Sequence, residues 1–543
     1  MSKIKIFSLG GLNENGKNTY IVEIDEKIFI LDAGLKYAND SMYGIDYIIP
    51  DYDYLVKNKK RIVGVFLTHA HPENIGGIKD LCDMIPSLKI YCTKYTKKYL
   101  ELDGFKGNIY EVQPHKKIAF NDISVFPISV THSVPDAVMY VINTKDGAIV
   151  YTGDFIIDPS MQGKYNMDIG KIAYIGKQGV LCLLSDSAFS EKEGHTSPNH
   201  RLTNFFRDNI NRAQGRIIFT VLPIHLFTIE EIFEAAKNTH RKIVIMGKKL
   251  QSVINMAIEE KYLSDYSSIL GDLSNINDNN VILLVCDDKE KPYTAIDRIV
   301  SGYDKFIKLK NTDTILFAEP RYDENEKIIV RLENEIAMLG AETISIPKDK
   351  EITHHASSED LMLMIDLLKP KYYMPVEGEY RYMVNNANIA SSLGIKNENI
   401  ILKTNGEVVL IENKKLNECY DKVNINEVLI DGNTNDDIGE LVIKDREMLS
   451  ENGIVLISAT LSKDTKELLV GPEVTTRGFI YIKDSKEMID TVKKISLSII
   501  EKNIGNNYVD YNNIKVEIRE SLSKYFYNET ECKPMIIAVI QEV

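Results

Sequence analysis

The sequence predicts an α/β protein of several domains, and three observations support this fold class. The chain has 543 residues, which is too many for a single hydrophobic core, since domains usually hold roughly 100–200 residues. Short apolar runs alternate with turns through the stretch 1–195. Strand-like and helix-like segments alternate from 196 to 345 and again from 441 to 543, which indicates sheets with helical crossovers.

The composition is typical of a globular protein without membrane contact. Hydrophobic residues make up 44% and charged residues 27% of the chain. No apolar run reaches the roughly 18–20 residues needed to span a bilayer, and the opening "MSKIKIFSLGG" has a strand pattern rather than that of a signal peptide. We therefore expect a cytoplasmic protein. The six cysteines are scattered without a CxxC pair, which argues against a thiolate zinc site.

The net charge of −14 bears on possible partners. An acidic protein repels polyanions at long range, so contact with RNA or DNA requires a local basic groove or a bound cation. Charge alone therefore counts against a nucleic-acid partner.

Several strands predicted in the stretch 1–195 share one feature: a polar residue stands at or just after the strand end. These residues are Asp32, His69, His132, Asp154 and Asp186. Polar groups gathered at one edge of a packed sheet are the usual way in which α/β folds build active sites. We therefore expect a functional site at this edge.

Four of the residues in this region form a metal-binding pattern. His69 and His71 stand one residue apart in "FLTHAHPENIGG", His132 lies in "VTHSVPD" and Asp154 in "TGDF". Three imidazoles and one carboxylate complete the coordination of Zn²⁺ or a similar borderline ion. The HxH spacing alone is a weak signal, but the two further strand-end residues strengthen it.

The order of these motifs resembles the ribonuclease J family, which combines the metallo-β-lactamase fold with an inserted β-CASP domain. The resemblance extends along the whole chain, through "GGLNENGKNTY", "LDAGLKY", "THSVPDAV", "IGKQGVLCLLSDS", "LLKPKYYMPVEGEYRYM" and "KPMIIAVIQEV". It implies an αββα metallo-β-lactamase sandwich in two parts (1–195 and 346–412), a β-CASP α/β domain (196–345), a linker (413–440) and a small C-terminal α/β oligomerisation domain (441–543).

The resemblance also implies roles for the candidate ligands. His69, His71 and His132 would hold one ion, and Asp154 would bridge to a second. The other second-ion positions carry Glu73, Asn74 and Glu377, where the family has Asp, His and His. Oxygen donors favour Mn²⁺ or Mg²⁺ over the Zn²⁺ expected at the first position. Paired-ion phosphodiester hydrolysis needs two ions roughly 3.5–4 Å apart, so a weak second position predicts impaired chemistry.

Further residues receive supporting roles from the same resemblance. Asp32 and Asp186 are expected to orient ligands or water, and His355, Ser357 and Ser358 to contact RNA phosphates. The loops "LLVCDDKEKPY", "FAEPRYDENEK" and "EITHHASSED" stand where the family has Ser- and Gly-rich phosphate-binding segments. Their acidic residues, among them Asp287, Asp288, Glu290 and Glu351, would repel phosphate. His225 and His354 are interpreted as structural.

The resemblance implies RNA processing and decay by metal-dependent 5′–3′ exonuclease and endonuclease activity, here weak or absent. Such a chain is similar to the less active of two paralogues, and would act with an active paralogue in a hetero-oligomer, or as a homo-dimer or tetramer. Two alternatives stay open. One is a fully active Mn²⁺-dependent ribonuclease with a carboxylate-rich second site, and the other is a non-catalytic architectural subunit. A hydrolase for thioesters or lactams fits poorly, because it has no use for the inserted domain.

Overall fold

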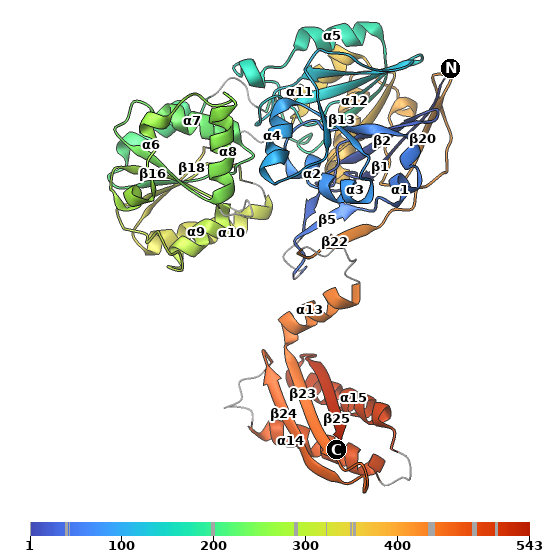
Figure 1. Cartoon of the computed structure of the whole chain (residues 1–543), viewed down its shortest axis with the longest axis vertical. Helices are drawn as coiled ribbons and strands as arrows, with labels where there is room; N and C mark the ends of the chain where they lie inside the picture. Colours follow the sequence, from blue (N-terminus) through green and yellow to red (C-terminus); the bar gives the residue numbers. More distant parts are fainter. Residues whose placement is uncertain are drawn as a thin grey trace. The chain divides into compact units, whose positions relative to one another are not determined.

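The computed structural model describes residues 2–38, 42, 44–196, 201–286, 292–321, 323–347, 350, 354–432, 440–479, 486–504 and 509–543. The chain divides into two compact units, one formed by residues 1–36 and 49–427 and the other by residues 37–48 and 428–543. Figure 1 shows the elements of both. The acidic residues Asp287, Asp288, Glu290 and Glu351, and most of the sequence "DGNTNDDIG", lie outside the described residues.

The first unit contains two sheets that pack face to face. The eight-stranded sheet has the order β21-β20-β1-β2-β3-β6-β7-β8. Its strands are β1 (Lys3–Gly10), β2 (Thr19–Ile24), β3 (Lys27–Leu31), β6 (Ile62–Phe66), β7 (Lys89–Cys92), β8 (Asn108–Glu111), β20 (Val409–Glu412) and β21 (Lys415–Asn417). The helices α1 (Asp53–Lys57), α2 (Pro72–Ile75), α3 (Ile78–Met84) and α4 (Lys94–Leu102) flank this sheet.

The second sheet has six strands in the order β19-β13-β12-β11-β10-β9. They are β9 (Ile118–Phe120), β10 (Ile123–Ser129), β11 (Val138–Thr144), β12 (Gly147–Tyr151), β13 (Val180–Asp186) and β19 (Tyr372–Val376). All seven residues of β13 are buried, as expected for a continuous apolar run in a strand covered on both faces. The covering helices are α5 (Ile169–Gln178), α11 (Ser358–Leu368) and α12 (Tyr380–Ser392).

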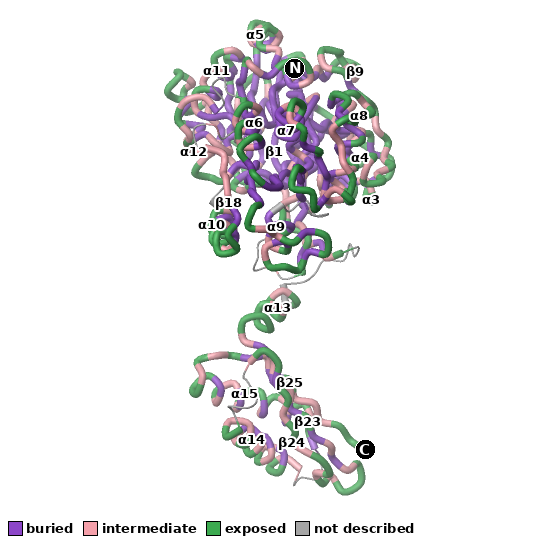
Figure 2. The backbone as a smooth tube through the Cα atoms, turned by 90° about the vertical axis from the view of Figure 1, so that its left-hand side faces the viewer, coloured by how far each residue is buried: buried purple, intermediate pink, exposed green. Residues whose placement is uncertain are grey.

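Two hydrophobic clusters hold these layers together. The one between the sheets joins Phe29 and Phe66 to Tyr140 and Tyr151, and the rings of Phe66 and Tyr140 lie 5.6 Å apart. The other lies between the six-stranded sheet and its helices. Figure 2 shows the strands of this unit as long buried segments. The αββα sandwich predicted from the sequence is confirmed.

A separate α/β domain is inserted between β13 and α11. Its five-stranded sheet has the order β15-β16-β14-β17-β18, and every neighbouring pair is parallel. The strands are β14 (Ile217–Thr220), β15 (Lys242–Met246), β16 (Val281–Val285), β17 (Thr314–Phe317) and β18 (Glu342–Ser345). The helices are α6 (Thr203–Arg212), α7 (Leu226–Ala236), α8 (Lys248–Glu259), α9 (Pro292–Val300) and α10 (Asp323–Met338).

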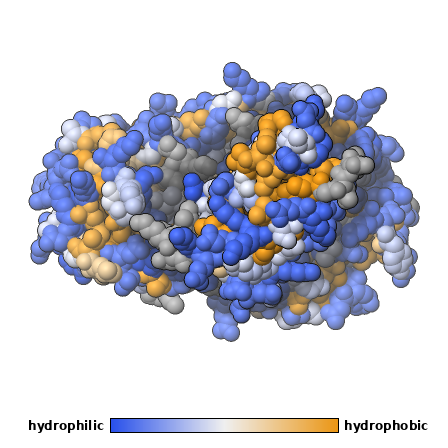
Figure 3. Space-filling view, turned by 90° about the horizontal axis from the view of Figure 1, so that it is seen from below, coloured by the Kyte–Doolittle hydropathy of each residue, from blue (hydrophilic) through white to orange (hydrophobic). Residues whose placement is uncertain are grey.

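The inserted domain contacts the sandwich through charged, polar and apolar side chains, the last in a buried cluster of Phe227 with Ile156, Met161 and Tyr165. Lys94 and Lys98 on α4 both form ion pairs with Glu260, and Tyr262 donates a hydrogen bond to Asp136. The domain also exposes large hydrophobic side chains, including Tyr303 and Phe306, which line a cavity of about 770 Å³. Figure 3 shows hydrophobic side chains gathered at the left of the view, on this domain.

The second unit is built around the three-stranded sheet β24-β23-β25. Its elements are α13 (Glu440–Asn452), β23 (Ile454–Leu461), β24 (Leu468–Arg477), α14 (Lys486–Ile504), α15 (Tyr511–Thr530) and β25 (Met535–Glu542). Burial alternates along most of β23, because one face of the sheet packs on α14 and α15, where Val455 and Ile457 join Ile518 and Leu522 in the core.

The stretch 413–440, predicted as a linker, contains regular structure. Besides β21 it holds β22 (Glu427–Ile430), which belongs to a small sheet in the order β22-β5-β4 with β5 (Tyr47–Pro50) and β4 (Lys36–Tyr37). Among the described residues, no helix combines the length and the apolar character needed to cross a bilayer.

Candidate metal centre

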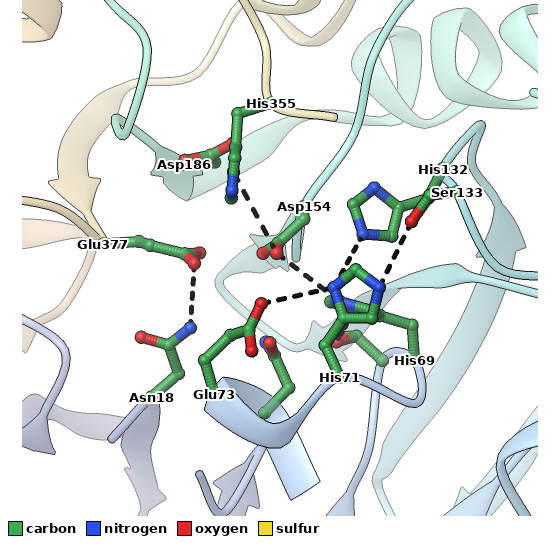
Figure 4. Close-up of polar contacts among 12 residues, drawn as sticks. Asn18, His69, His71, Glu73, His132, Ser133, Asp154, Asp186, His355 and Glu377 are labelled. Carbon is green, nitrogen blue, oxygen red and sulfur yellow. Dashed lines mark hydrogen bonds and ion pairs between the residues drawn. The ribbon is translucent and has the colours of Figure 1, made fainter. Parts of the chain in front are cut away.

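Four predicted ligands meet at the edge of the sandwich where strands of both sheets end. His69 and His71 follow β6, His132 follows β10 and Asp154 follows β12. All four side chains are buried, and each offers a ligand atom within 4.8 Å of the others (Figure 4). These residues, His69, His71, His132 and Asp154, are called the first group below.

The spacing of the donor atoms fits a tetrahedral metal site. His132 Nε2 lies 3.2 Å from His71 Nδ1, and His69 Nε2 lies 3.4 Å from Asp154 Oδ2. In a tetrahedral site with metal–ligand distances of about 2.0–2.1 Å, neighbouring donors lie about 3.4 Å apart. Donor atoms whose lone pairs face one another at this distance repel each other, and a cation bound between them would stabilise the arrangement.

Unpartnered buried atoms also indicate a cation. Among the described residues, His69 Nε2 and both carboxylate oxygens of Asp154 are buried without a hydrogen-bond partner. Each such atom costs about 1–3 kcal/mol when nothing satisfies it. A metal ion among these donors would satisfy all of them at once, so the residues fit the group that the sequence predicts.

Burial sets the protonation states that a metal site needs. It lowers the pKa of both His69 and His71 to about 4, so both rings are neutral at pH 7 and offer a lone pair. Burial raises the pKa of Asp154 to about 7. A nearby cation favours the ionised carboxylate, which is the form that binds metal.

Asp32 anchors the loop that carries His69. Its buried carboxylate accepts hydrogen bonds from the Thr68 backbone N–H at 2.7 Å and from the Tyr151 hydroxyl at 2.8 Å. The Thr68 hydroxyl donates to Asp32 at 2.9 Å and lies 2.9 Å from His69 Nδ1. Asp32 therefore fixes the ring of His69 through Thr68 without lying among the ligand atoms.

A second group of possible ligands shares Asp154 with the first. It consists of Asp154, His355 and Glu377, whose donor atoms also lie within 4.8 Å of one another. Glu377 follows β19 and accepts a hydrogen bond from Asn18 Nδ2 at 2.9 Å. His355 Nδ1 lies 3.1 Å from Asp186 Oδ2 and 4.0 Å from Asp154 Oδ2. The second group thus contains an imidazole that the sequence assigned to phosphate binding.

The charges of the second group partly balance one another. Burial alone would lower the pKa of His355, but the carboxylates of Asp186 and Asp154 raise it well above its usual value. These carboxylates therefore favour the charged form of the ring. Burial, together with the neighbouring Asp154 and Asp186, raises the pKa of Glu377 well above its usual range.

Glu73 and Asn74 contact other partners. Glu73 Oε1 lies 3.2 Å from His71 Nδ1, and Glu73 belongs to neither group. Asn74 donates its amide to Asp32 Oδ2 at 2.9 Å. Of the two carboxylates predicted to complete the second position, the structure brings only Glu377 into a group with Asp154, and the carbonyl oxygen of the Asn74 side chain is buried without a hydrogen-bond partner among the described residues.

The short helix α2 explains this placement. The backbone carbonyl of Glu73 accepts a hydrogen bond from Asn18 N at 2.9 Å, and that of Asn74 accepts one from Ala33 N at 2.8 Å. Gly34 allows this close approach, because a Cβ built there would stand 1.6 Å from the Glu73 carbonyl oxygen. The packing of α2 against the 33–35 loop therefore sets the direction of both side chains.

Ser357 and Ser358 stand at the start of α11. Ser357 forms a capping box with Asp360 and its hydroxyl lies 2.5 Å from Thr196 Oγ1. The backbone N–H of Ser358 donates to the Lys192 carbonyl at 3.0 Å. The Ser357 hydroxyl is thus engaged within the fold, and phosphate binding by either serine stays a prediction.

Sequence reasoning missed several residues that touch the site: Asn18, Thr68, Ser133 and Tyr151. Thr68 directly precedes His69, so its role has a signal in the sequence. Tyr151 has none, because a tyrosine that ends an apolar strand is indistinguishable from an ordinary core residue. Ser133 Oγ lies 3.2 Å from His71 Nε2. Like Thr68, Ser133 is adjacent in sequence to a predicted ligand, here His132, so its place near the site could have been predicted.

Comparisons with known proteins agree with this architecture. Residues 12–163 match the metallo-beta-lactamase superfamily, residues 214–336 the ribonuclease J beta-CASP domain and residues 441–543 the ribonuclease J C-terminal domain. A solved structure of a protein of unknown function from Enterococcus faecalis V583 has a similar fold. Its TM-score is 0.52 at 15% identity, over 75% of this chain and 100% of that one.

Full-length relatives establish the family. The chain is 36% identical to Ribonuclease J2 of Bacillus subtilis, over 99% of both proteins. It is 32% identical to Ribonuclease J 2 of Staphylococcus saprophyticus, over 99% of this chain and 98% of that protein. The resemblance inferred from the motifs is confirmed, and with it the expectation of divalent metal binding typical of the metallo-β-lactamase superfamily. The chain belongs to the ribonuclease J family.

Proposed function

We propose that this chain is an RNA-processing protein of the ribonuclease J type that binds one divalent ion firmly and a second weakly or not at all. The ion would be held by His69, His71, His132 and Asp154. The family membership supports the RNA substrate, and the converging, unpartnered donors of the first group support the metal.

One observation carries the proposal of impaired activity: the Glu73 carboxylate and the Asn74 amide nitrogen contact residues outside the second group, although Asn74 Oδ1 is buried without a hydrogen-bond partner in the described part of the chain. Glu73 points to His71 and Asn74 donates to Asp32. An ion bound at the first group supplies positive charge that polarises a phosphodiester. The residues of the first group would bind and orient that ion, but a second ion, roughly 3.5–4 Å away, would have fewer ligands because Glu73 contacts His71 instead. Hydrolysis of RNA is therefore weak or absent.

The donor sets suggest which ions bind. Imidazole nitrogens dominate the first group, which favours Zn²⁺. The second group offers two carboxylates and one imidazole, and carboxylates suit Mn²⁺ or Mg²⁺ better. Because a metal ligand must be deprotonated, the raised pKa of His355 disfavours this ring as a ligand at that position.

The chain would act in the cytoplasm, either in a hetero-oligomer with an active ribonuclease J paralogue or as a homo-dimer or tetramer. Residues 441–543 would form part of the contact between subunits. The net charge of −14 supports a partner, because the partner could supply the basic surface that RNA binding needs. A purely architectural role is a weaker candidate, since the first group keeps a complete ligand set.

A second candidate is an active Mn²⁺-dependent ribonuclease. It is favoured by Glu377 Oε2, which is buried without a hydrogen-bond partner among the described residues and belongs to the same group as Asp154. A hard ion bridging these two carboxylates would satisfy both.

Incubation of the purified chain with 5′-monophosphorylated RNA separates the two candidates. The reaction is followed in Mn²⁺, Mg²⁺ and Zn²⁺, and bound metal is counted after equilibrium dialysis. Impaired function predicts one ion per chain and little turnover. Two ions per chain, with fast turnover that is lost in His71→Ala, would establish the active enzyme instead.

A further inference from the structure

The two ring nitrogens of His71 face different surroundings. Nδ1 lies on the side of the metal centre, 3.2 Å from His132 Nε2. Nε2 lies 3.3 Å from the backbone carbonyl oxygen of Ile224. A ligating histidine usually donates its outer N–H to a carbonyl or carboxylate, which fixes the tautomer and the ring direction. Ile224 supplies that acceptor, and Ile224 belongs to the inserted domain rather than to the sandwich.

The Ile224 carbonyl sits in a turn that is held at two points by one carboxylate. The turn follows β14 and leads into α7. Glu319 Oε1 accepts a hydrogen bond from the Leu222 backbone N–H at 2.6 Å, and Glu319 Oε2 is in buried hydrogen-bond contact with His225 Nδ1. Glu319 and His225 are only 3% and 5% exposed, so this connection is shielded from solvent.

The position of Glu319 in the sheet makes the connection rigid. Glu319 follows β17, and β17 pairs directly with β14 over its full length. The carboxylate therefore bridges the ends of two adjacent parallel strands. The imidazole of His225 also packs near His71, with ring centroids 5.7 Å apart, so the turn cannot shift without disturbing the ligand.

A second contact joins the same two parts of the chain. The backbone N–H of Phe227, at the start of α7, donates to the Ser133 carbonyl at 3.1 Å. The hydroxyl of Ser133 lies 3.2 Å from His71 Nε2. The turn and helix of the inserted domain thus approach His71 both directly and through Ser133.

We propose that Glu319 and His225 are positioning residues for the metal centre. They hold the Ile224 carbonyl against the outer N–H of His71, so that Nδ1 is directed at the ion. Metal affinity then depends on how the inserted domain is docked. This inference rests on the proposed role of His71 as a metal ligand. Since such coupling is reciprocal, a bound ion in turn stabilises the docked turn.

The test compares Glu319→Gln with Glu231→Gln in the full-length chain. Glu231 is a matched control, since it is 2% exposed in the same domain and accepts hydrogen bonds from Leu202 N and Thr203 Oγ1 at the start of α6. Co²⁺ affinity is measured by competition with a chelator, and the visible absorption spectrum of bound Co²⁺ reports the ligand geometry. Thermal unfolding without metal records any general loss of stability.

The expected result is that Glu319→Gln weakens Co²⁺ binding about 10–100-fold, the usual effect of removing a partner behind a metal ligand, and alters the Co²⁺ spectrum. Glu231→Gln should keep the affinity and spectrum of the unchanged chain. Full Co²⁺ affinity and an unchanged spectrum in Glu319→Gln would overturn this inference but leave the proposed metal centre intact. If the unchanged chain binds no Co²⁺, the proposed metal centre fails as well.

His225→Gln provides a second variant should Glu319→Gln not fold. It removes the imidazole while leaving the Leu222 hydrogen bond to Glu319 in place, so a smaller loss of Co²⁺ affinity in the same direction is expected. Hydrogen exchange at residues 221–227 adds an independent readout. Metal should slow exchange there in the unchanged chain and not in His225→Gln, and equal protection in both would contradict the proposal.

Discussion

The first and second groups share Asp154 yet differ in what their other donors do. In the first group, two of the three imidazoles are held by neighbours at the nitrogen that does not face the centre: His69 Nδ1 lies beside Thr68, and His71 Nε2 beside the Ile224 carbonyl, whereas His132 Nδ1 is buried without a hydrogen-bond partner among the residues that the structure describes. In the second group, partners compete for the donors themselves. Asp186 lies 3.1 Å from His355 Nδ1, and Asn18 donates to Glu377 Oε1.

The difference shows that a ligand set is defined by the direction of its atoms as well as by its residue types. The first group places neutral imidazoles next to Asp154, so a cation would satisfy its buried donors. In the second group, the carboxylates of Asp186 and Asp154 raise the pKa of His355, which favours its charged form. The proposal that the first group binds its ion more firmly than the second rests on this difference.

The largest expected effect comes from rebuilding the second group. The triple variant Glu73→Asp, Asn74→His and Glu377→His restores the ligands that the family has at these positions. We expect a second ion per chain and a rise in RNA hydrolysis of about 10²–10³-fold, the scale of one added electrostatic stabiliser of the transition state. Metal counting and single-turnover assays measure both. A triple variant that still binds one ion would show that Glu73 and Asn74 are not the limiting positions.

Removing a donor from the first group should abolish its metal. His132→Ala takes away one of four ligands and leaves a buried space, so bound Zn²⁺ should fall from one ion per chain to nearly none. Glu377→Gln is the matched control, because it alters the second group and should leave this ion in place. Bound Zn²⁺ is measured by equilibrium dialysis. An equal loss of Zn²⁺ in both variants would contradict the assignment of this ion to the first group.

Asp32→Asn tests whether the hydrogen bonds of Asp32 orient the ring of His69. The amide keeps the size of the side chain but cannot accept from Thr68, Asn74 and Tyr151 together. Zn²⁺ affinity should fall about 10–100-fold, as for other residues that orient a ligand. Asp186→Asn, whose carboxylate contacts His355 instead, should change the affinity of the first ion much less. A larger loss of Zn²⁺ affinity in Asp186→Asn than in Asp32→Asn would contradict the role assigned to Asp32.

The smallest effect is expected at Ser357. Its side chain caps α11 next to His355, so Ser357→Ala should lower the free energy of unfolding by about 1 kcal/mol without changing bound Zn²⁺. Denaturant unfolding measures the loss, with Ser358→Ala as a control expected to be nearly neutral. A loss of RNA binding without a loss of stability would instead favour a role in phosphate contact.

The sequence predicted those parts of the molecule whose signals are local. The apolar runs that end in His69, His132 and Asp154 are strands, and strand ends of one layer meet at one edge. The directions of Glu73 and Asn74 could not be predicted, because tertiary hydrogen bonds to Asn18 and Ala33 set the orientation of α2. The stretch 413–440 is polar and was therefore predicted to be a linker, but its short strands pair with segments that are distant in the sequence.

Two further features of the site depend on contacts between distant segments. His355 meets Asp186 across 169 positions of sequence, so its membership of the second group follows only from the packed structure. The acceptor for His71 is a backbone carbonyl, at Ile224, and any residue type could supply it. His225 and His354 were interpreted as structural, and the proposed role of His225 comes from its contact with Glu319.

Anomalous diffraction from crystals soaked in Zn²⁺ and then in Mn²⁺ tests the central claim most directly, since it reports the occupancy of both groups in one experiment. The account predicts a strong peak among His69, His71, His132 and Asp154, and little or no density between Asp154 and Glu377. Two peaks of similar height in either metal, or a single peak beside Glu377, would contradict it.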